Sequence, residues 1–459
     1  MKNYLLLFLL LSSCCAAAQT AAVFSNTNAV YQDNIRSVKC HISEFPLSLP
    51  IVEMGKGGSI SLHFDDTDAE MKRYLYSLTL CNANWQPSDL ADFEYLTGFN
   101  ENLIRDCQLS VSTLYKYTHY YLSLPNADIK WTKSGNYLLK VYEENNEKTP
   151  VLSRRIMVSE PKMQILATMV PPAGSGKTQT HQEIDFKLFH RSMTVSNPKI
   201  EISATVLQNH RWDNAITGIR PFFIYQESMD FDYQDLISFP ASKEFRVLDM
   251  RNFRFKSEFV ESILRYRDGY GVKLLPEKKR VNEVNFFYRD ANGGFLIENS
   301  DDVNRIRDIG YSAKLQNDSW NIRGTGPGKT LYSLNTSNLT PDYAMVSFTY
   351  DRPTEFNDAD LYVLGEFNDW QPSEANKLTY DAEQRAYKTN ILLKQGYYNY
   401  TYAVVHKEYP NALDTEETEG NYYETDNEYS ILIYYRPFGE RYDRLIAVSS
   451  FSSTATRGK

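Results

Sequence analysis

Residues 398–404 read YNYTYAV and place a large aromatic or apolar side chain at every second position. Successive side chains of a β-strand point to opposite faces of a sheet, so this alternation predicts a strand with one buried face. The same two-residue period recurs along the chain, at residues 38–42, 60–64, 74–80, 184–188, 200–206 and 431–435. Helical periodicity is scarce, and residues 249–266 form the one window that is compatible with a short helical turn. The pattern therefore predicts an all-β protein.

Two stretches rich in turn-forming residues divide the chain. The first begins at Pro161 and continues through residues 171–176 (PPAGSG), and the second covers residues 323–341. Short strands separated by such turns are typical of antiparallel sandwiches. We therefore expect three consecutive immunoglobulin-like or E-set β-sandwich domains, at residues 20–160, 161–322 and 340–450.

Aromatic residues make up 14% of the chain, with 34 Tyr, 24 Phe and 5 Trp. Flat rings pack well on the pleated surface of a sheet, which again favours a β protein. The formal net charge is −9, so the chain as a whole does not attract nucleic acid or anionic lipid. We expect no nucleic-acid partner.

The first 18 residues have the layout of a secretory signal peptide. Lys2 supplies the positive charge, residues 4–11 form a short apolar run, and residues 16–18 are three alanines. An apolar run of this length cannot span a bilayer, which needs about 20 residues. Residues 11–14 (LSSC) also resemble a lipoprotein processing box, in which Cys14 would carry the lipid. We expect a signal peptide at residues 1–18 and no membrane span, with a lipid anchor at Cys14 as the alternative.

Three cysteines follow the signal peptide: Cys40, Cys81 and Cys107. In an oxidising compartment an odd number allows one disulfide, such as Cys81 with Cys107, and leaves one thiol over. The alternative is that all three are small buried apolar side chains. Both interpretations stay open.

Motifs for catalysis or cofactor binding are weak. Residues 174–178 (GSGKT) resemble the end of a phosphate-binding loop, but Pro171 stands where that loop needs its first glycine. The seven histidines are scattered, and neither an HExxH pair nor a G-x-S-x-G turn occurs. We expect no cofactor, no metal site and no enzymatic activity. A hydrolase with an unrecognised pair among the 58 acidic residues stays open.

Residues 364–370 (LGEFNDW) and 396–402 (GYYNYTY) give the third domain a local signature. Together they resemble the glycogen- and starch-binding modules appended to amylase-type enzymes, which are small β-sandwiches. Such modules stack sugar rings on exposed aromatic side chains, and Trp370 is the matching residue. The resemblance implies a sandwich and, as an alternative function, carbohydrate binding through Trp370. The other interpretation is a turn that only packs against the sandwich edge.

A larger set of segments resembles one family. In the first domain these segments are residues 81–85 (CNANW), 95–98 (YLTG), 117–120 (YTHY), 124–126 (LPN) and 134–137 (SGNY). Near the end of the chain they are residues 422–429 (YYETDNEY), 434–439 (YYRPFG) and 441–445 (RYDRL). Their order and spacing are similar to those of the plug protein of the type IX secretion system of Bacteroidetes, over about residues 31–448.

The family resemblance implies a non-enzymatic periplasmic protein associated with the outer membrane. It would bind and seal the periplasmic end of the outer-membrane translocon barrel and be released when the channel engages substrate or its shuttle. It would be monomeric apart from that complex. A plug that must leave suits a polar, tyrosine-rich interface better than an obligate apolar one. The other interpretation is that most tyrosines pack on sheet faces or line ordinary solvent-exposed strands. The alternative is a periplasmic or surface carbohydrate-binding protein that acts through the C-terminal domain.

Overall fold

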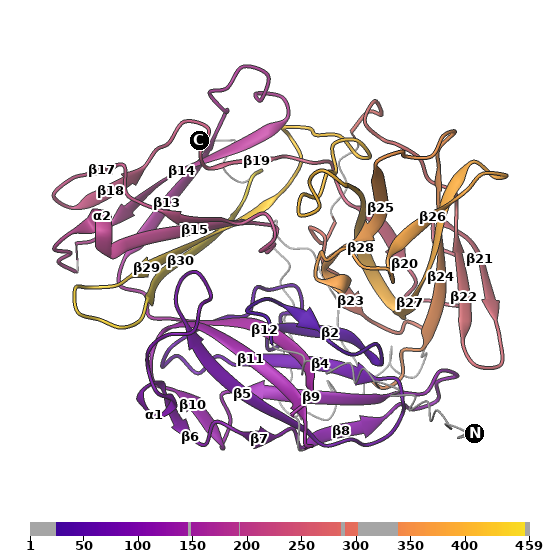
Figure 1. The fold of residues 1–459 in the computed structure, drawn as a ribbon, viewed down its shortest axis with the longest axis horizontal. Coiled ribbons are helices and arrows are strands. Elements are labelled where there is room, and N and C mark those ends of the chain that lie inside the picture. Colours follow the sequence, from indigo (N-terminus) through magenta and orange to yellow (C-terminus); the bar gives the residue numbers. More distant parts are fainter. Residues whose placement is uncertain (1–23, 146–147, 192, 286–289, 302–337, 455–459) are drawn as a thin grey trace, which may run out of the picture.

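The computed structural model describes residues 24–145, 148–191, 193–285, 290–301 and 338–454, which form three β bodies in mutual contact (Figure 1). Nearly every regular element is a strand, and this confirms the predicted all-β class. Across the described ranges, no helix is long and apolar enough to cross a membrane. The predicted signal peptide and Cys14 lie outside the described residues.

Body I is a sandwich of two sheets built from the first strands of the chain. One sheet has the order β1-β12-β11-β5-β7, with β3 paired to β12, and the other has the order β2-β4-β9-β8. The apolar face of each sheet supplies the core between them, as the alternation in residues 60–64 and 74–80 predicts. The elements are β1 (Ala29–Val30), β2 (Ile35–Ile42), β3 (Ile51–Glu53), β4 (Ile60–Asp66), β5 (Tyr74–Cys81), α1 (Asp92–Tyr95), β6 (Leu96–Gly98), β7 (Asn102–Leu103), β8 (Asp106–Leu109), β9 (Thr118–Leu124), β10 (Ile129–Trp131), β11 (Gly135–Glu143) and β12 (Pro150–Ser159).

Body II combines strands from the middle and the end of the chain. One sheet has the order β13-β14-β18-β17, with β19 paired to β14, and the other has the order β16-β15-β29-β30. Both sheets contribute to one core cluster. The elements are β13 (Gln164–Val170), β14 (His181–Phe189), α2 (Pro198–Glu201), β15 (Ile202–Gln208), β16 (Ile216–Ile219), β17 (Phe223–Ile224), β18 (Ser228–Phe231), β19 (Ser238–Pro240), β29 (Glu428–Tyr435) and β30 (Arg444–Ser452).

Body III is one sheet of nine strands with the order β20-β28-β25-β26-β27-β24-β22-β21, and β23 pairs with β28. Strand β26 pairs with β25 on one side and β27 on the other, and side chains of both halves of the sheet enclose one core. The elements are β20 (Arg246–Asp249), β21 (Val260–Arg265), β22 (Tyr270–Leu274), β23 (Phe295–Ile297), β24 (Tyr343–Asp351), β25 (Ala359–Leu364), η1 (Glu366–Asn368), β26 (Lys377–Asp381), β27 (Ala386–Lys394) and β28 (Gly396–His406).

The strand pairing departs from the predicted boundaries at 161–322 and 340–450. Strands β20 to β23, from the expected middle segment, belong to the sheet of body III. Strands β29 and β30, from the expected third segment, return to body II, where β29 pairs with β15 from Ile202↔Tyr435 to Gln208↔Tyr429. Alternation identifies a strand but not its partner, so these long-range pairings could not be read from the pattern. The window 249–266 contains the end of β20 and all of β21, and no helical turn.

The many tyrosines are mostly core residues. The largest side chains that are less than 2% exposed are all tyrosines: Tyr74, Tyr76, Tyr117, Tyr120, Tyr137, Tyr343, Tyr350, Tyr398, Tyr400, Tyr402, Tyr429 and Tyr434. Several donate their hydroxyl to a buried partner, for example Tyr74 to Asp66 at 2.8 Å. A ring with one polar end can fill a sheet interior and satisfy a buried acceptor. These twelve rings are therefore not available for a tyrosine-rich interface, and they match the interpretation that the tyrosines pack on sheet faces.

Candidate interaction surface

Asp65 lies at the centre of the contact between bodies I and III. One carboxylate oxygen accepts hydrogen bonds from Lys394 Nζ at 2.6 Å and Tyr343 Oη at 2.7 Å, both from body III. The other oxygen is 2.7 Å from Nδ1 of His119 on β9. The side chains of Asp65 and Lys394 are each 1% exposed. Burial by itself raises the pKa of Asp65, but Lys394 and His119 outweigh it and lower that pKa.

Two more ion pairs connect body I to the turn around η1. Lys39 pairs with Glu366, and Arg154 lies 3.1 Å from Asp369. The side chains of Lys39 and Arg154 are buried. A buried charge is tolerated only with its partner in place, so these pairs favour one arrangement of bodies I and III.

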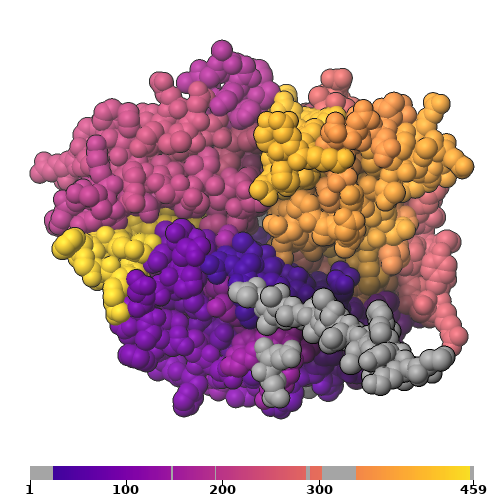
Figure 2. Space-filling view, viewed as in Figure 1, coloured from indigo at the N-terminus to yellow at the C-terminus, as the bar shows by residue number. Residues whose placement is uncertain are grey.

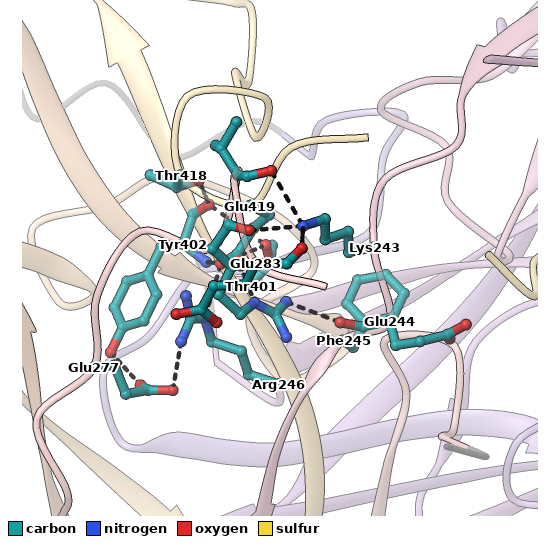
Figure 3. Close-up of polar contacts among 12 residues, drawn as sticks. Lys243, Glu244, Phe245, Arg246, Glu277, Glu283, Thr401, Tyr402, Thr418 and Glu419 are labelled. Atoms are coloured by element: carbon teal, nitrogen blue, oxygen red, sulfur yellow. Dashed lines mark hydrogen bonds and ion pairs between the residues drawn. The ribbon is translucent and has the colours of Figure 1, made fainter. Parts of the chain in front are cut away.

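A second polar network lies inside body III, around Arg246 (Figure 3). Nε of Arg246 donates to Glu419 at 2.9 Å, and Nη1 donates to Glu277 at 2.8 Å. Tyr402 Oη donates to Glu277 at 2.6 Å. Arg280 pairs with the second oxygen of Glu419 at 2.6 Å. The network joins two loops to strands β20 and β28.

The carboxyl groups near Arg246 differ widely in pKa. Burial raises the pKa of Glu419, but Arg246 and Arg280 outweigh it and hold the pKa at about 2. Burial and the nearby Asp290 raise the pKa of Glu244 to about 8. Two carboxyl groups with separated pKa values are what acid–base catalysis uses. However, neither Glu244 nor Glu419 lines either of the two cavities described for the molecule.

Segments that carry the family resemblance meet where bodies I and II join. The backbone N–H of Ala83 donates to Asp443 at 2.7 Å, and Asp443 also pairs with Arg436 at 2.8 Å. Tyr434 Oη donates to Oδ1 of Asn136 at 2.9 Å. The segments in this joint are residues 81–85, 134–137, 434–439 and 441–445.

Two tryptophans complete the same joint. The rings of Trp85 and Trp212 meet edge to face, with 5.1 Å between their centroids. The guanidinium of Arg155 lies 4.7 Å from the Trp85 ring and 4.9 Å from the Trp212 ring. Trp85 is buried in the cluster that joins the two bodies. Bodies I and II therefore share a packed apolar contact as well as hydrogen bonds.

A cleft of about 730 Å³ opens beside this joint. Its wall includes Asn82 and Arg436 from the two motifs and Ile200 and Arg220 from body II. Phe438, also in the wall, is 100% exposed, and Ile200 is 69% exposed. An exposed aromatic ring beside an aliphatic side chain and two arginines has the composition of a protein-binding surface. We define this cleft with Phe438 and Ile200 as the motif cleft.

Acidic groups in the motif cleft already have partners. Asp443 pairs with Arg436, as described above, and Glu440 pairs with Arg444. The carboxylate of Glu201 accepts the backbone N–H of Ser196 at 3.1 Å. These contacts hold the walls in place, so the groups that face outward for a partner are chiefly the apolar ones.

Trp370 does not have the exposure that the starch-binding resemblance implies. Its side chain is 6% exposed. The guanidinium of Arg211 covers the ring at 4.0 Å from the centroid, and Phe245 packs against it at 5.6 Å. A Cβ added at Gly293 would lie 2.5 Å from the same ring. The expectation of an exposed sugar-stacking ring at Trp370 is therefore corrected: the turn packs inside the molecule.

All three cysteines of the described chain are free thiols. Cys81 is buried, while Cys40 and Cys107 are half-buried and pack against the core of body I. Cys81 lies in the cluster shared by bodies I and II, so it is separated from Cys107 on β8. The arrangement matches the interpretation of small apolar side chains.

One group of potential metal ligands in the described chain was not predicted from the sequence. His406, Asp414 and Glu417 bring one ligand atom each within 4.8 Å of one another. Asp414 is held by the backbone N–H groups of Glu416 and Glu417, at 2.8 and 3.2 Å. Glu417 also faces Arg352 at 3.5 Å, which already supplies a positive charge. The spacing of these three residues along the sequence matches no metal-binding motif, so the sequence carried no signal for this group.

Comparison with known proteins agrees with this picture. Residues 35–160 match the family model described as "Type 9 secretion system plug protein 1st domain". A similar solved structure is the crystal structure of a hypothetical protein from Parabacteroides merdae, which is 29% identical. It aligns with a TM-score of 0.81 over 93% of this chain and 99% of that protein. No curated protein matches the chain.

The fold and the motif cleft first define a class of protein. It is an all-β protein of several joined bodies, with an exposed cleft that has the composition of a protein-binding surface. Residues 35–160, within body I, match the first-domain model of the type 9 secretion system plug protein, and the predicted family resemblance is confirmed. The family match indicates a role in type IX secretion, association with components of that system and a location in the cell envelope.

Proposed function

We propose that this protein is a non-enzymatic plug that seals the periplasmic end of the outer-membrane translocon barrel of the type IX secretion system. It leaves the barrel when the channel engages substrate or its shuttle. In this proposal the protein is periplasmic, is delivered by the signal peptide at residues 1–18, and is monomeric outside the complex. Lipidation at Cys14 would be an additional anchor to the outer membrane.

The observation that supports the proposal best is how the bodies are joined. Body I meets body III through the buried pair of Asp65 and Lys394, and meets body II through a packed cluster around Trp85. A stopper for a wide pore must keep its shape, and buried polar contacts between bodies have one favourable geometry. The first-domain family match then identifies the system in which such a stopper would act.

The motif cleft is the surface that we assign to the barrel. One side of it is built by segments that carry the family resemblance and the other by residues 196–220 of body II, and it presents Phe438 with its whole side chain exposed. Release requires an affinity that differs between the idle and the engaged channel. A small apolar centre with a charged rim suits such a separable contact better than a large apolar interface.

Affinity purification from solubilised outer membranes tests this assignment. The tagged wild-type chain should retain the barrel from cells that are not secreting, and less of it from cells that are. Phe438→Ser should lower the recovery at least about tenfold if the ring is a central contact. Phe93→Ser is the matched control, because Phe93 is 85% exposed but lies on α1, outside the motif cleft.

If Phe438→Ser recovers as much of the barrel as Phe93→Ser does, the motif cleft is not the surface that binds the barrel. Failure to recover any barrel, in either secretion state, would contradict the plug function itself.

A further inference from the structure

The hairpin of β21 and β22 lies at one edge of body III. Among the described strands, β21 is the last of its sheet and pairs only with β22. In Figures 1 and 2 the hairpin is at the right-hand edge of the molecule. Gly269 in its turn is buried, and a Cβ added there would lie 3.9 Å from Tyr115 of body I. Residues 264–268 on the outer side of the turn are exposed and could meet another surface.

Large apolar side chains are exposed on and beside this hairpin. Near the tip, Leu264 is 53% and Tyr266 54% exposed. Beside its base, Phe255 is 75%, Phe259 44% and Leu275 44% exposed. Phe259 and Leu275 are neighbours, since the N–H of Leu275 donates to the carbonyl of Phe259 at 3.0 Å. Five such side chains within 21 residues exceed the scattered exposure of an ordinary surface.

The Tyr266 ring lies across the hairpin rather than in the core. A Cβ added at Gly271 would be 2.8 Å from that ring, so the glycine makes room for it. Leu264 pairs with Gly271 across the two strands. Leu264 and Tyr266 thus lie on the same part of the hairpin surface.

The charge of this segment is opposite to that of the chain. Residues 254–279 contain seven basic and four acidic residues, in a chain with a formal net charge of −9. Arg265 and Arg267 flank Tyr266, are exposed, and form no ion pair within the described ranges. Within the hairpin itself Lys273 pairs with Glu261 at 2.8 Å. The positive charge available there therefore comes from Arg265 and Arg267, which stand next to Asp268.

We propose that the β21–β22 hairpin docks on an anionic phospholipid surface. Leu264 and Tyr266 enter the interfacial layer while Arg265 and Arg267 contact the lipid phosphates. Exposed aromatic and aliphatic residues alternating with arginine are the composition of interfacial membrane segments. Basic residues near an anionic bilayer each contribute to binding, and the contribution falls off within a Debye length. The inference does not depend on the plug function.

Co-sedimentation of the full chain with lipid vesicles tests the proposal. Vesicles of phosphatidylglycerol and phosphatidylethanolamine should bind the protein, while vesicles of phosphatidylcholine alone should bind it weakly. Arg265→Gln/Arg267→Gln should lower the partition coefficient about 25-fold, which is about fivefold for each charge. Leu264→Ser/Tyr266→Ser should lower it at least about tenfold, because two buried apolar side chains are lost.

Two comparisons keep the outcomes distinct. Phe93→Ser removes a more exposed ring that stands between Asp92 and Glu94, and should leave vesicle binding unchanged. An unchanged thermal unfolding midpoint shows that each variant is folded. Loss of binding in the arginine variant but not in the Leu264/Tyr266 variant would overturn insertion, leaving only charge adsorption. No binding to phosphatidylglycerol vesicles, with retention on immobilised polyglutamate, would overturn the proposal in favour of an acidic protein partner.

Discussion

The contact between Asp65 and Lys394 provides a direct test of how firmly bodies I and III are joined. We expect Lys394→Met to lower the free energy of unfolding by about 3–5 kcal/mol, because it leaves the Asp65 carboxylate buried without its cation. The distance of 2.6 Å and the 1% exposure of both side chains place this pair in the buried class. A solvent-exposed pair would be worth only about 0–1 kcal/mol.

The double variant separates the pair from the packing around it. Asp65→Asn/Lys394→Met removes both charges, and Tyr343 can still donate its hydroxyl to the new amide oxygen. We therefore expect the double variant to be less destabilised than the sum of the two single variants, by at least about 1 kcal/mol. The charges then act as a coupled pair.

Urea unfolding followed by tyrosine fluorescence measures these free energies. Hydrogen exchange would show whether β4 and β27, which carry the two residues, become exchangeable together. A cost below about 1 kcal/mol for Lys394→Met would refute the reasoning, since it would mean that water replaces the lost partner. Additive single variants would show that the two charges are not coupled.

Two further changes follow from burial. Trp370→Ala should lower the free energy of unfolding by about 3–5 kcal/mol, because the ring is 6% exposed, and urea unfolding measures this change. A small loss of stability together with a loss of starch binding would restore the carbohydrate interpretation. Burial lowers the pKa of His41 from its ordinary value of 6.5 to about 4. The folded state therefore favours the neutral form of His41. The stability that His41 contributes is present above pH 6.5 and is lost as the pH falls toward 4. Over that range the free energy of unfolding falls by at most about 1.4 kcal/mol per pH unit. His41→Gln should flatten the pH dependence of the unfolding free energy between pH 7 and 5, and identical slopes would contradict this.

Local strand formation could be predicted from the sequence, because alternation reflects which face of a strand is buried. Residues 60–64, 74–80 and 398–404 are all in strands. Residues 74–80 alternate between buried and half-buried side chains as predicted, whereas residues 398–404 are buried on both faces. Strand partners could not be predicted, because β15 pairs with β29 across more than 200 residues of sequence. Pairing of this kind depends on the whole fold rather than on local propensity.

The candidate surface was predictable only in pieces. Segments such as 81–85 and 434–439 could be recognised, but their convergence at Asp443 required the fold. Trp370 looked like an exposed ring because its cover, Arg211, comes from body II. Net charge also concealed the two exposed arginines on either side of Tyr266, since a sum over 459 residues cannot show a local feature.

Ion conductance of the purified barrel in a planar bilayer measures sealing directly. Adding this protein on the periplasmic side should reduce the open-channel conductance in a saturable manner, and adding it on the outer side should not. Conductance that stays the same at saturating protein, with a barrel shown to be open, would contradict the role of a stopper.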